Sequence, residues 1–204
     1  MANLKEIRAR ISSVGSTMQI TSAMKMVSAA KLKRAQDAIT QMRPYANKLR
    51  ELLVNLSSTL EGSDGGDFAQ EREAKKVLLV VITSNRGLCG AFNTNIIKKA
   101  KSLAENDYSN ADVSFLTIGK KGSEFFVKNG FTVFSSHDSL YDELTFENTS
   151  AITEEIMQNF LGGDFDKVIL VYNQFKNAAT QLVQAEQFLP VETPKEEGAI
   201  ISDY

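Results

Sequence analysis

The first sixty residues carry one continuous helical pattern. Apolar residues recur at alternating spacings of three and four, a period of 3.5 that is typical of one strand of a left-handed coiled coil. Asn3 followed by Glu6 predicts the helix start and Gly62 predicts its stop. The pattern predicts one helix over residues 3–60, roughly 87 Å long at 1.5 Å per residue. The stripe consists of Leu4, Ile7, Ile11, Val14, Met18, Leu32, Ala35, Ile39, Met42, Ala46, Leu49, Leu53, Leu56 and Leu60.

The stripe loses its register in the middle of this helix. Three positions that would continue it are polar, and the apolar character moves to positions one residue earlier. One residue is about 100° around a helix, so the stripe turns away from its main partner here. Two interpretations stay open, namely ordinary irregularity in a long coiled coil and contact with a third body. The polar positions are Thr21, Lys25 and Ser28, and the apolar ones are Ile20, Met24 and Val27.

A stripe of this length needs a second helix to cover it. No later helical segment of the sequence has the same pattern or a comparable length. Either two copies of the chain pair, or the partner helix lies beyond Tyr204. Pro44 removes one backbone hydrogen bond and allows a kink in the helix.

After the helix the pattern changes twice. Residues 61–74 are rich in Gly, Asp and Glu and predict a mobile linker. From residue 75 strands alternate with helices, which predicts an α/β fold with a Rossmann-like open, mostly parallel sheet covered by helices over residues 75–204. The last two strands leave no room for a helix between them and predict an antiparallel edge hairpin. The predicted strands are 77–83, 113–118, 131–135, 167–172 and 181–189, and the predicted helices are 92–106, 120–129 and 150–161.

Composition restricts the location and the covalent chemistry. Hydrophobic residues make up 43% of the chain and charged residues 24%, as in ordinary soluble domains. The longest apolar run, residues 77–82, has the length of a strand and is too short for a transmembrane segment. The N-terminus lacks an apolar signal core, which predicts a location on the cytoplasmic side. Single Cys and His residues exclude an internal disulfide and argue against a structural zinc site.

Charge is distributed unevenly along the chain. Residues 1–50 hold ten Lys or Arg and two acids, a net charge of +8, whereas the remainder has a net charge of −10. This asymmetry predicts an acidic or anionic partner for the first quarter. Lys31, Lys33 and Arg34 cluster just after the register change. No aromatic residue precedes Tyr45 for base stacking, and the apolar stripe requires a protein neighbour, so a protein is favoured over nucleic acid.

The segment 84–90 follows the first predicted strand and opens a helix. Phosphates bind at this place in many open parallel sheets. The loop fits neither GxGxxG nor GxxxxGK[ST], and no acidic residue lies about twenty positions further on to hold a ribose. Arg86, Gly87, Cys89 and Gly90 therefore predict a structural turn in which the two glycines supply backbone freedom. A Rossmann-type nucleotide-binding protein with an added coiled coil is the alternative.

The sequence contains no credible set of catalytic residues. Ser136, His137, Asp138 and Ser139 include the residue types of a hydrolytic triad, but adjacent residues cannot adopt its geometry. Cys89 has no histidine near it in sequence to activate it. The sequence therefore predicts a protein that is not an enzyme and has no cofactor-binding or metal-binding residues.

Two segments resemble the gamma subunit of F-type, proton-translocating ATP synthases. Residues 19–32, QITSAMKMVSAAKL, are similar to the N-terminal helix signature of that family, and residues 84–93, SNRGLCGAFN, are similar to its turn. The opening LKEIRARISSV and the RPYA sequence from Arg43 match in the expected order and spacing. Departures include Ser22, where a lysine is common, so the basic surface has one charge fewer. The other departures are Ser28, Asn85 and Ala91.

The resemblance implies a central-stalk rotor subunit. Such a subunit couples rotation of the proton-driven c-ring to conformational cycling of the catalytic beta subunits. It implies as partners the alpha and beta subunits, whose hexamer bore holds the helix, the epsilon subunit and the c-ring, and as location the cytoplasmic face of the bacterial inner membrane. Residues Met24, Lys25, Lys31, Lys33 and Arg34 are then expected to face acidic loops of beta.

The resemblance also implies a further helix. Family members continue for roughly a third of their length beyond a segment like residues 201–204, as a long C-terminal helix that winds antiparallel around the first. This continuation is absent from the sequence and matches the missing partner of the apolar stripe. The chain alone is therefore expected to keep its globular domain and to be unable to transmit torque. Its unpaired helix is expected to fray, to pair with a second copy or to pack in a non-native way.

Overall fold

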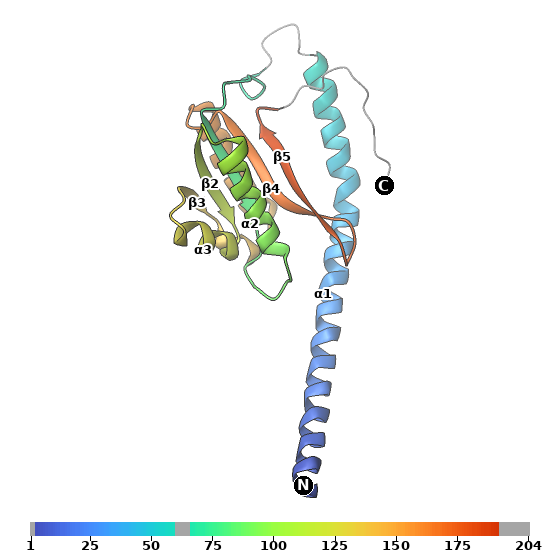
Figure 1. The fold of residues 1–204 in the computed structure, drawn as a ribbon. Coiled ribbons are helices and arrows are strands. Elements are labelled where there is room, and N and C mark those ends of the chain that lie inside the picture. The colour runs from blue at the N-terminus through green and yellow to red at the C-terminus, as the bar shows by residue number, and fades with distance from the viewer. Residues whose placement is uncertain (1–2, 60–65, 192–204) are drawn as a thin grey trace. The chain divides into compact units, whose positions relative to one another are not determined.

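A computed structural model describes residues 3–59 and 66–191 of the chain (Figure 1). The chain divides into two compact units between Leu56 and Ser57. The first unit is a single helix and the second contains a sheet with its covering helices. Each unit is described by itself.

Helix α1 spans Leu4–Thr59 and contains 56 residues. Asn3 caps its start, because the Asn3 Oδ1 accepts a hydrogen bond of 3.2 Å from the backbone N–H of Lys5. The helix continues through Pro44 without a break in its assignment. The long helix predicted over residues 3–60 is confirmed; its predicted stop, Gly62, lies outside the described residues.

The second unit is an α/β domain built on one five-stranded sheet with the strand order β3-β2-β1-β4-β5. Strands β1 to β4 run parallel, and β5 pairs antiparallel with β4 as the predicted edge hairpin. The predicted open, mostly parallel sheet is confirmed. The strands are β1 Lys76–Ile82, β2 Asp112–Ile118, β3 Val133–Ser136, β4 Lys167–Phe175 and β5 Gln181–Leu189. The helices are α2 Phe92–Ser102, α3 Lys120–Lys128 and α4 Phe146–Leu161, with short turns η1 Leu103–Asp107 and η2 Asp138–Tyr141.

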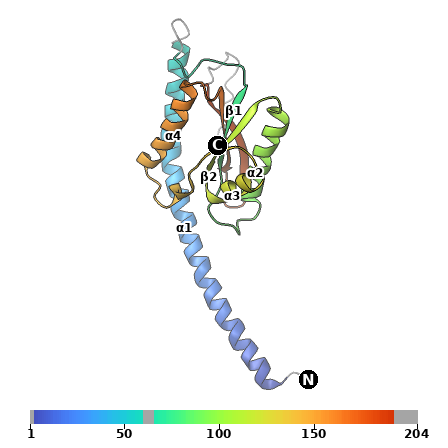
Figure 2. The ribbon, with the colours of Figure 1, turned by 90° about the vertical axis from the view of Figure 1, so that its left-hand side faces the viewer.

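Helices cover both faces of the sheet (Figures 1 and 2). Residues 77–81 of β1 are almost fully buried, as expected for a central strand whose alternate side chains reach two separate cores. Leu79 packs with residues of α2 and α3 on one face, and Leu78 packs with residues of α4 on the other. Because β1 and β2 run parallel, they end at the same edge of the sheet, and the loops after them meet there.

Two helix boundaries differ from the prediction. Helix α4 begins at Phe146 instead of residue 150, because the Thr145 Oγ1 accepts a hydrogen bond from the backbone N–H of Asn148 and caps the helix there. Its first turn is exposed and contains one apolar residue, Phe146, among polar ones, so apolar periodicity did not reveal it. After Ser102 the chain widens into a π turn, closed by a 2.9 Å bond from the Tyr108 N–H to the Leu103 carbonyl.

The described part of the predicted linker is fixed to the α/β domain. Phe68 stacks on Phe160 of α4 at 6.3 Å between ring centroids. The Arg72 guanidinium lies 5.0 Å from the same ring and donates a 3.1 Å hydrogen bond to the Phe160 carbonyl. That carbonyl belongs to the last turn of α4 and also accepts a 3.2 Å bond from the Gly163 N–H. Residues 66–74 therefore differ from the mobile linker that composition predicts, because these contacts hold them in place.

Candidate functional site

The apolar side chains of α1 are exposed to solvent. Met18 and Met24 expose 68% and 64% of their surface, values otherwise found at polar positions of a helix. Monomeric proteins rarely leave a contiguous apolar stripe of this length uncovered. The described part of α1 therefore has the properties of a surface that binds another helix or protein. The large exposed apolar residues of α1 are Leu4, Ile7, Ile11, Val14, Met18, Ile20, Met24, Met26, Val27, Leu32, Met42, Tyr45, Leu49 and Leu52.

A second face of α1 begins where the stripe changes register. At about 100° per residue, the side chains of this face fall within about 80° of one another. The face lies about 110° from the apolar stripe, so one partner helix on the stripe leaves it uncovered. It carries two cations next to three apolar side chains. Its members are Ile20, Met24, Val27, Lys31 and Arg34.

The other two cations predicted for partner contact lie elsewhere on the helix. Lys25 continues the apolar stripe, and Lys33 points about 140° away from the centre of the second face. The Lys33 Nζ also lies 2.7 Å from the Asp37 carboxylate one turn later. Within the described residues, Lys31 and Arg34 form no ion pair. Helix geometry therefore places three of the five predicted contact residues, Met24, Lys31 and Arg34, on one face. The other two, Lys25 and Lys33, lie on different faces.

Two threonine hydroxyls near the register change, those of Thr17 and Thr21, are bonded to carbonyls of the helix itself. The Thr21 hydroxyl lies 2.9 Å from the Thr17 carbonyl and 3.0 Å from the Met18 carbonyl, and the Thr17 hydroxyl donates to the Ser13 carbonyl at 3.0 Å. Such bonds cost little and favour a slight helix bend. These hydroxyls need no polar partner on a neighbouring protein.

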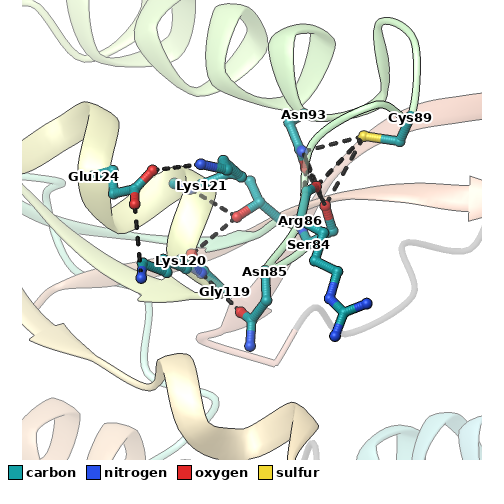
Figure 3. A network of polar contacts seen from close by, with 11 residues as sticks. Ser84, Asn85, Arg86, Cys89, Asn93, Gly119, Lys120, Lys121 and Glu124 are labelled. Carbon is teal, nitrogen blue, oxygen red and sulfur yellow. Dashed lines mark hydrogen bonds and ion pairs between the residues drawn. The ribbon is translucent and has the colours of Figure 1, made fainter.

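The turn after β1 is organised by Asn93, a polar residue of α2 that is 8% exposed (Figure 3). The Asn93 Oδ1 accepts from the Ser84 backbone N–H at 2.9 Å. The Asn93 Nδ2 lies 2.9 Å from the Ser84 Oγ, 3.3 Å from the Arg86 carbonyl and 3.2 Å from the Cys89 Sγ. Asn93 was not among the predicted site residues; its position in the first turn of a helix that faces the core was the available signal.

Two residues of this turn, Gly90 and Leu88, adopt a left-handed φ. Gly90 has a φ of 61°, as predicted for a glycine with special geometry. Gly87 does not adopt a left-handed φ, and its role in the turn stays a prediction. Leu88 has a φ of 61° instead, and its side chain is fully exposed. The Arg86 guanidinium points away from the hydrogen-bonded cluster, while the Arg86 carbonyl belongs to it (Figure 3).

The same edge of the sheet joins β1 to α3. The Thr83 hydroxyl donates to the Gly119 carbonyl at 3.0 Å and accepts from the Gly122 N–H at 2.8 Å. The Asn85 side chain bridges two loops, since its Oδ1 accepts from the Lys120 N–H and its Nδ2 donates to the Asp138 carbonyl. Several backbone N–H groups at this edge, those of Lys120, Lys121 and Gly122, are thus bonded within the protein. This arrangement favours the structural turn over the nucleotide-binding alternative.

His137 has partners, but their geometry does not form a catalytic triad. The Ser135 Oγ lies 2.8 Å and the Glu155 Oε2 lies 3.1 Å from the same ring nitrogen, Nε2. A triad needs the nucleophile on one ring nitrogen and the carboxylate on the other. Both neighbours meet Nε2, so the carboxylate does not orient the ring through Nδ1 as a triad requires. The contact therefore ties β3 to α4 and does not activate a nucleophile.

The described residues contain neither a metal-binding cluster nor a membrane-spanning helix. Across residues 3–59 and 66–191, no three His, Cys, Asp or Glu side chains gather in a way that could hold a metal ion. No helix in these ranges combines the length and the apolar character that a membrane crossing requires.

A long helix with uncovered apolar and basic faces, joined to an α/β domain with a closed core, defines a protein that acts by assembling with other proteins. The family described as ATP synthase matches residues 3–203. The ATP synthase gamma chain of Flavobacterium johnsoniae is 60% identical over 205 residues, which cover 100% of this chain and 71% of that protein. The gamma chain of Christiangramia forsetii is 60% identical over 192 residues, or 94% of this chain and 67% of that protein. The chain belongs to the ATP synthase gamma chain family and spans about two thirds of the length of these relatives.

Solved structures agree with this assignment. The central stalk and c-ring structure of the Tetrahymena thermophila mitochondrial ATP synthase contains a chain with a TM-score of 0.68 and 31% identity, covering 84% of this chain and 72% of that one. The rotor of the Euglena gracilis enzyme gives a TM-score of 0.62 at 23% identity, covering 91% of this chain and 62% of that one, and supports the fold alone. The resemblance found in residues 19–32 and 84–93 is confirmed.

Proposed function

We propose that the chain is the central-stalk rotor subunit of an F-type ATP synthase, which couples c-ring rotation to conformational cycling of the catalytic beta subunits. The observation that carries this proposal is the 60% identity to a gamma chain along the whole sequence. The structure adds a 56-residue helix with uncovered apolar side chains, as a shaft that packs inside a complex requires.

The proposed division of labour follows the two units. Residues 1–60 form one strand of the shaft, residues 61–74 lead into the globular domain, and residues 75–204 form that domain. The apolar stripe packs against a second helix, which in complete gamma subunits is the C-terminal one. The globular domain contacts the epsilon subunit and the c-ring. The protein performs no chemistry itself and lies, through the complex, on the cytoplasmic face of a bacterial inner membrane.

The second face of α1 is the proposed contact with the beta subunits. Met24 supplies apolar area, and Lys31 and Arg34 supply charge that no described neighbour neutralises. A rotor acts as a ligand that binds different beta conformations with different affinity and so shifts their populations. Such a contact must lie outside the seam with the second helix, and the angular position of this face meets that requirement.

Charge reversal on this face tests the proposal. Residues 1–204 are joined to the part of the Flavobacterium johnsoniae gamma chain outside the match, and the chimera is assembled with its alpha and beta subunits in membrane vesicles. Lys31→Glu with Arg34→Glu is expected to lower ATP-driven proton pumping per ATP hydrolysed by about fivefold or more, because acidic loops would be repelled. Fluorescence quenching of a pH dye measures pumping, and phosphate release measures hydrolysis.

The control is Lys5→Glu with Arg8→Glu, a pair with the same residue types, spacing and change in net charge on the same helix. This variant should retain most of the coupling. Equal loss in both pairs, or unchanged coupling in the first pair, would remove the proposed contact face. Failure of the unmodified chimera to assemble with alpha and beta would contradict the rotor role itself.

A further inference from the structure

A group of exposed apolar side chains lies between β3 and the first turn of α4. Phe146 exposes 82% of its surface, Leu144 exposes 68% and Tyr141 exposes 42%. None of the three packs into either core of the α/β domain. Three exposed carboxylates lie among them in sequence. We name this group the 141–147 surface, and it consists of Tyr141, Asp142, Glu143, Leu144, Phe146 and Glu147.

Local structure does not account for these apolar residues. Leu144 precedes the N-cap Thr145, the position from which a hydrophobic staple reaches the fourth helical residue. That residue is Thr149, whose hydroxyl bonds back to the Thr145 carbonyl at 2.8 Å, so the staple has no apolar partner. Phe146 occupies the first helical position, where a large apolar side chain has no capping role. The two side chains therefore cost solubility without contributing to the fold described.

The backbone beneath the surface is fixed by hydrogen bonds. The Asn148 Nδ2 donates to the Glu143 carbonyl at 2.9 Å, and the Asn148 N–H donates to the Thr145 Oγ1 at 3.2 Å. The Asn85 Nδ2 bond to the Asp138 carbonyl, at 2.8 Å, ties the preceding turn to β1. A surface that is already ordered loses little conformational entropy on binding. A hollow of about 430 Å³ adjoins it, lined by His137, Asp142, Glu143, Asn148 and Glu155, among others.

The charge of this region is of one sign. Between Lys128 and Lys167 the sequence has eight acidic residues and no Lys or Arg. Within the described residues, Asp142, Glu143 and Glu147 form no ion pair. Such a surface repels nucleic acid and anionic membranes and attracts a basic partner. The remaining acidic residues of the segment are Asp138, Glu154, Glu155, Asp164 and Asp166.

We propose that the 141–147 surface binds a cationic, amphipathic segment of a partner protein, with Leu144 and Phe146 buried against its apolar face and the carboxylates paired with its Lys or Arg side chains. Charge complementarity selects this occupant over the others. Aromatic and aliphatic anchors inside a charged rim have the composition of protein-binding sites. The inference concerns a face of the α/β domain and goes beyond the proposed rotor role, on which it does not depend.

A binding measurement on the full chain tests this inference. The probe is a fluorescently labelled amphipathic helical peptide of Lys and Leu, about five turns long, and anisotropy reports its affinity. Leu144→Ser with Phe146→Ser is expected to weaken binding by at least about tenfold. Asp142→Asn with Glu143→Gln and Glu147→Gln should weaken it by about threefold or more at low salt and less at high salt. All five residues are exposed, so these variants keep the fold.

Controls separate this surface from other exposed apolar groups. Val127→Ser with Leu161→Ser removes two apolar side chains that are 61% and 44% exposed and should leave the affinity unchanged. A Glu–Leu peptide of the same pattern should bind the 141–147 surface poorly, and any binding it shows to the basic α1 should not respond to Leu144→Ser with Phe146→Ser. Unchanged affinity for the Lys–Leu peptide in that double variant would overturn the proposal. Self-association in ultracentrifugation that the double variant abolishes would also overturn it, because the occupant would then be a second copy.

Discussion

Helix α1 and the α/β domain use apolar residues in opposite ways. In the α/β domain, residues such as Leu79 and Phe115 are 0–1% exposed and fill two cores on the faces of one sheet. In α1, the comparable residues Met18 and Ile11 are 68% and 67% exposed. The α/β domain therefore carries its stability within itself, whereas most of the favourable burial available to α1 depends on a partner. The apolar residues of the first unit are available to a partner, and those of the second unit stabilise its own fold.

Removing a core ring gives the largest effect that this comparison predicts. Phe126 is fully buried, stacks on Phe115 at 4.2 Å and meets Phe131 edge-on at 5.4 Å. Phe126→Ala should lower the free energy of unfolding of the α/β domain by about 3–5 kcal/mol, because the lost contacts leave a cavity. Urea unfolding, with hydrogen exchange of the β1 amides as the readout, measures the change in the free energy of unfolding.

The neighbouring residue provides the control. Val127 is 61% exposed on the same helix, and Val127→Ala should change the free energy of unfolding by less than about 0.5 kcal/mol. Met24→Ala on α1 should leave exchange of the β1 amides unchanged. A loss of more than about 2 kcal/mol from Met24→Ala would show that the stability of the two units is coupled.

Two glycines sharpen the comparison with effects of opposite sign. Gly119 has a φ of 103°, and a Cβ there would lie 2.1 Å from the Thr83 carbonyl oxygen. Gly119→Ala should therefore destabilise the α/β domain by at least about 2 kcal/mol through strain and a clash with backbone. Gly15 lies inside α1 with nothing within 4 Å of a Cβ. Gly15→Ala should raise the helix content of α1, since Ala is favoured over Gly by about 1 kcal/mol in a helix.

Thermal unfolding and far-ultraviolet circular dichroism distinguish the two glycine variants. A tolerated Gly119→Ala would mean that the loop after β2 relaxes freely, against the close packing seen beside Thr83. A Gly15→Ala variant with lower helix content would mean that Gly15 serves a contact outside the described chain.

The sequence allowed the elements to be predicted because each one follows from a local period. The continuous apolar run of β1 and the heptad stripe of α1 both depend on residues close together in the chain. The capped, exposed first turn of α4 and the π turn after Ser102 were missed, since neither continues the apolar periodicity.

The candidate sites were only partly predictable. The bonds from Asn85 to Asp138 and from Thr83 to Gly119 join residues 53 and 36 positions apart, which no single-sequence pattern reveals. Arg72 is another example, because its partner Phe160 lies 88 positions away in sequence. The division of the basic cluster on α1 was predictable, because helix geometry alone places Lys31 and Arg34 on one face and Lys33 on another.

The smallest expected effect comes from Tyr108 of the α/β domain. It is a pH dependence of stability that α1 is not expected to share. Burial, and to a lesser extent the nearby Asp107 carboxylate, raises the pKa of the Tyr108 phenol above its usual value of 10.0. Near pH 10 the unfolded chain therefore loses this proton before the folded chain does. The stabilising contribution of the neutral phenol is complete below pH 10 and is lost as the pH rises through the folded-state pKa.

Alkaline unfolding tests this difference. Tyr108→Phe should make the stability of the α/β domain fall less steeply between pH 9 and pH 11, because the half-buried phenol no longer titrates in the variant. Tyr45→Phe, at a 67% exposed position of α1, should leave the slope for the β1 amides unchanged. An identical slope in wild type and Tyr108→Phe would mean that the unfolded chain already buries this phenol. The unfolded α/β domain would then retain residual structure around this phenol. The exposed residues of α1 would form no such residual structure.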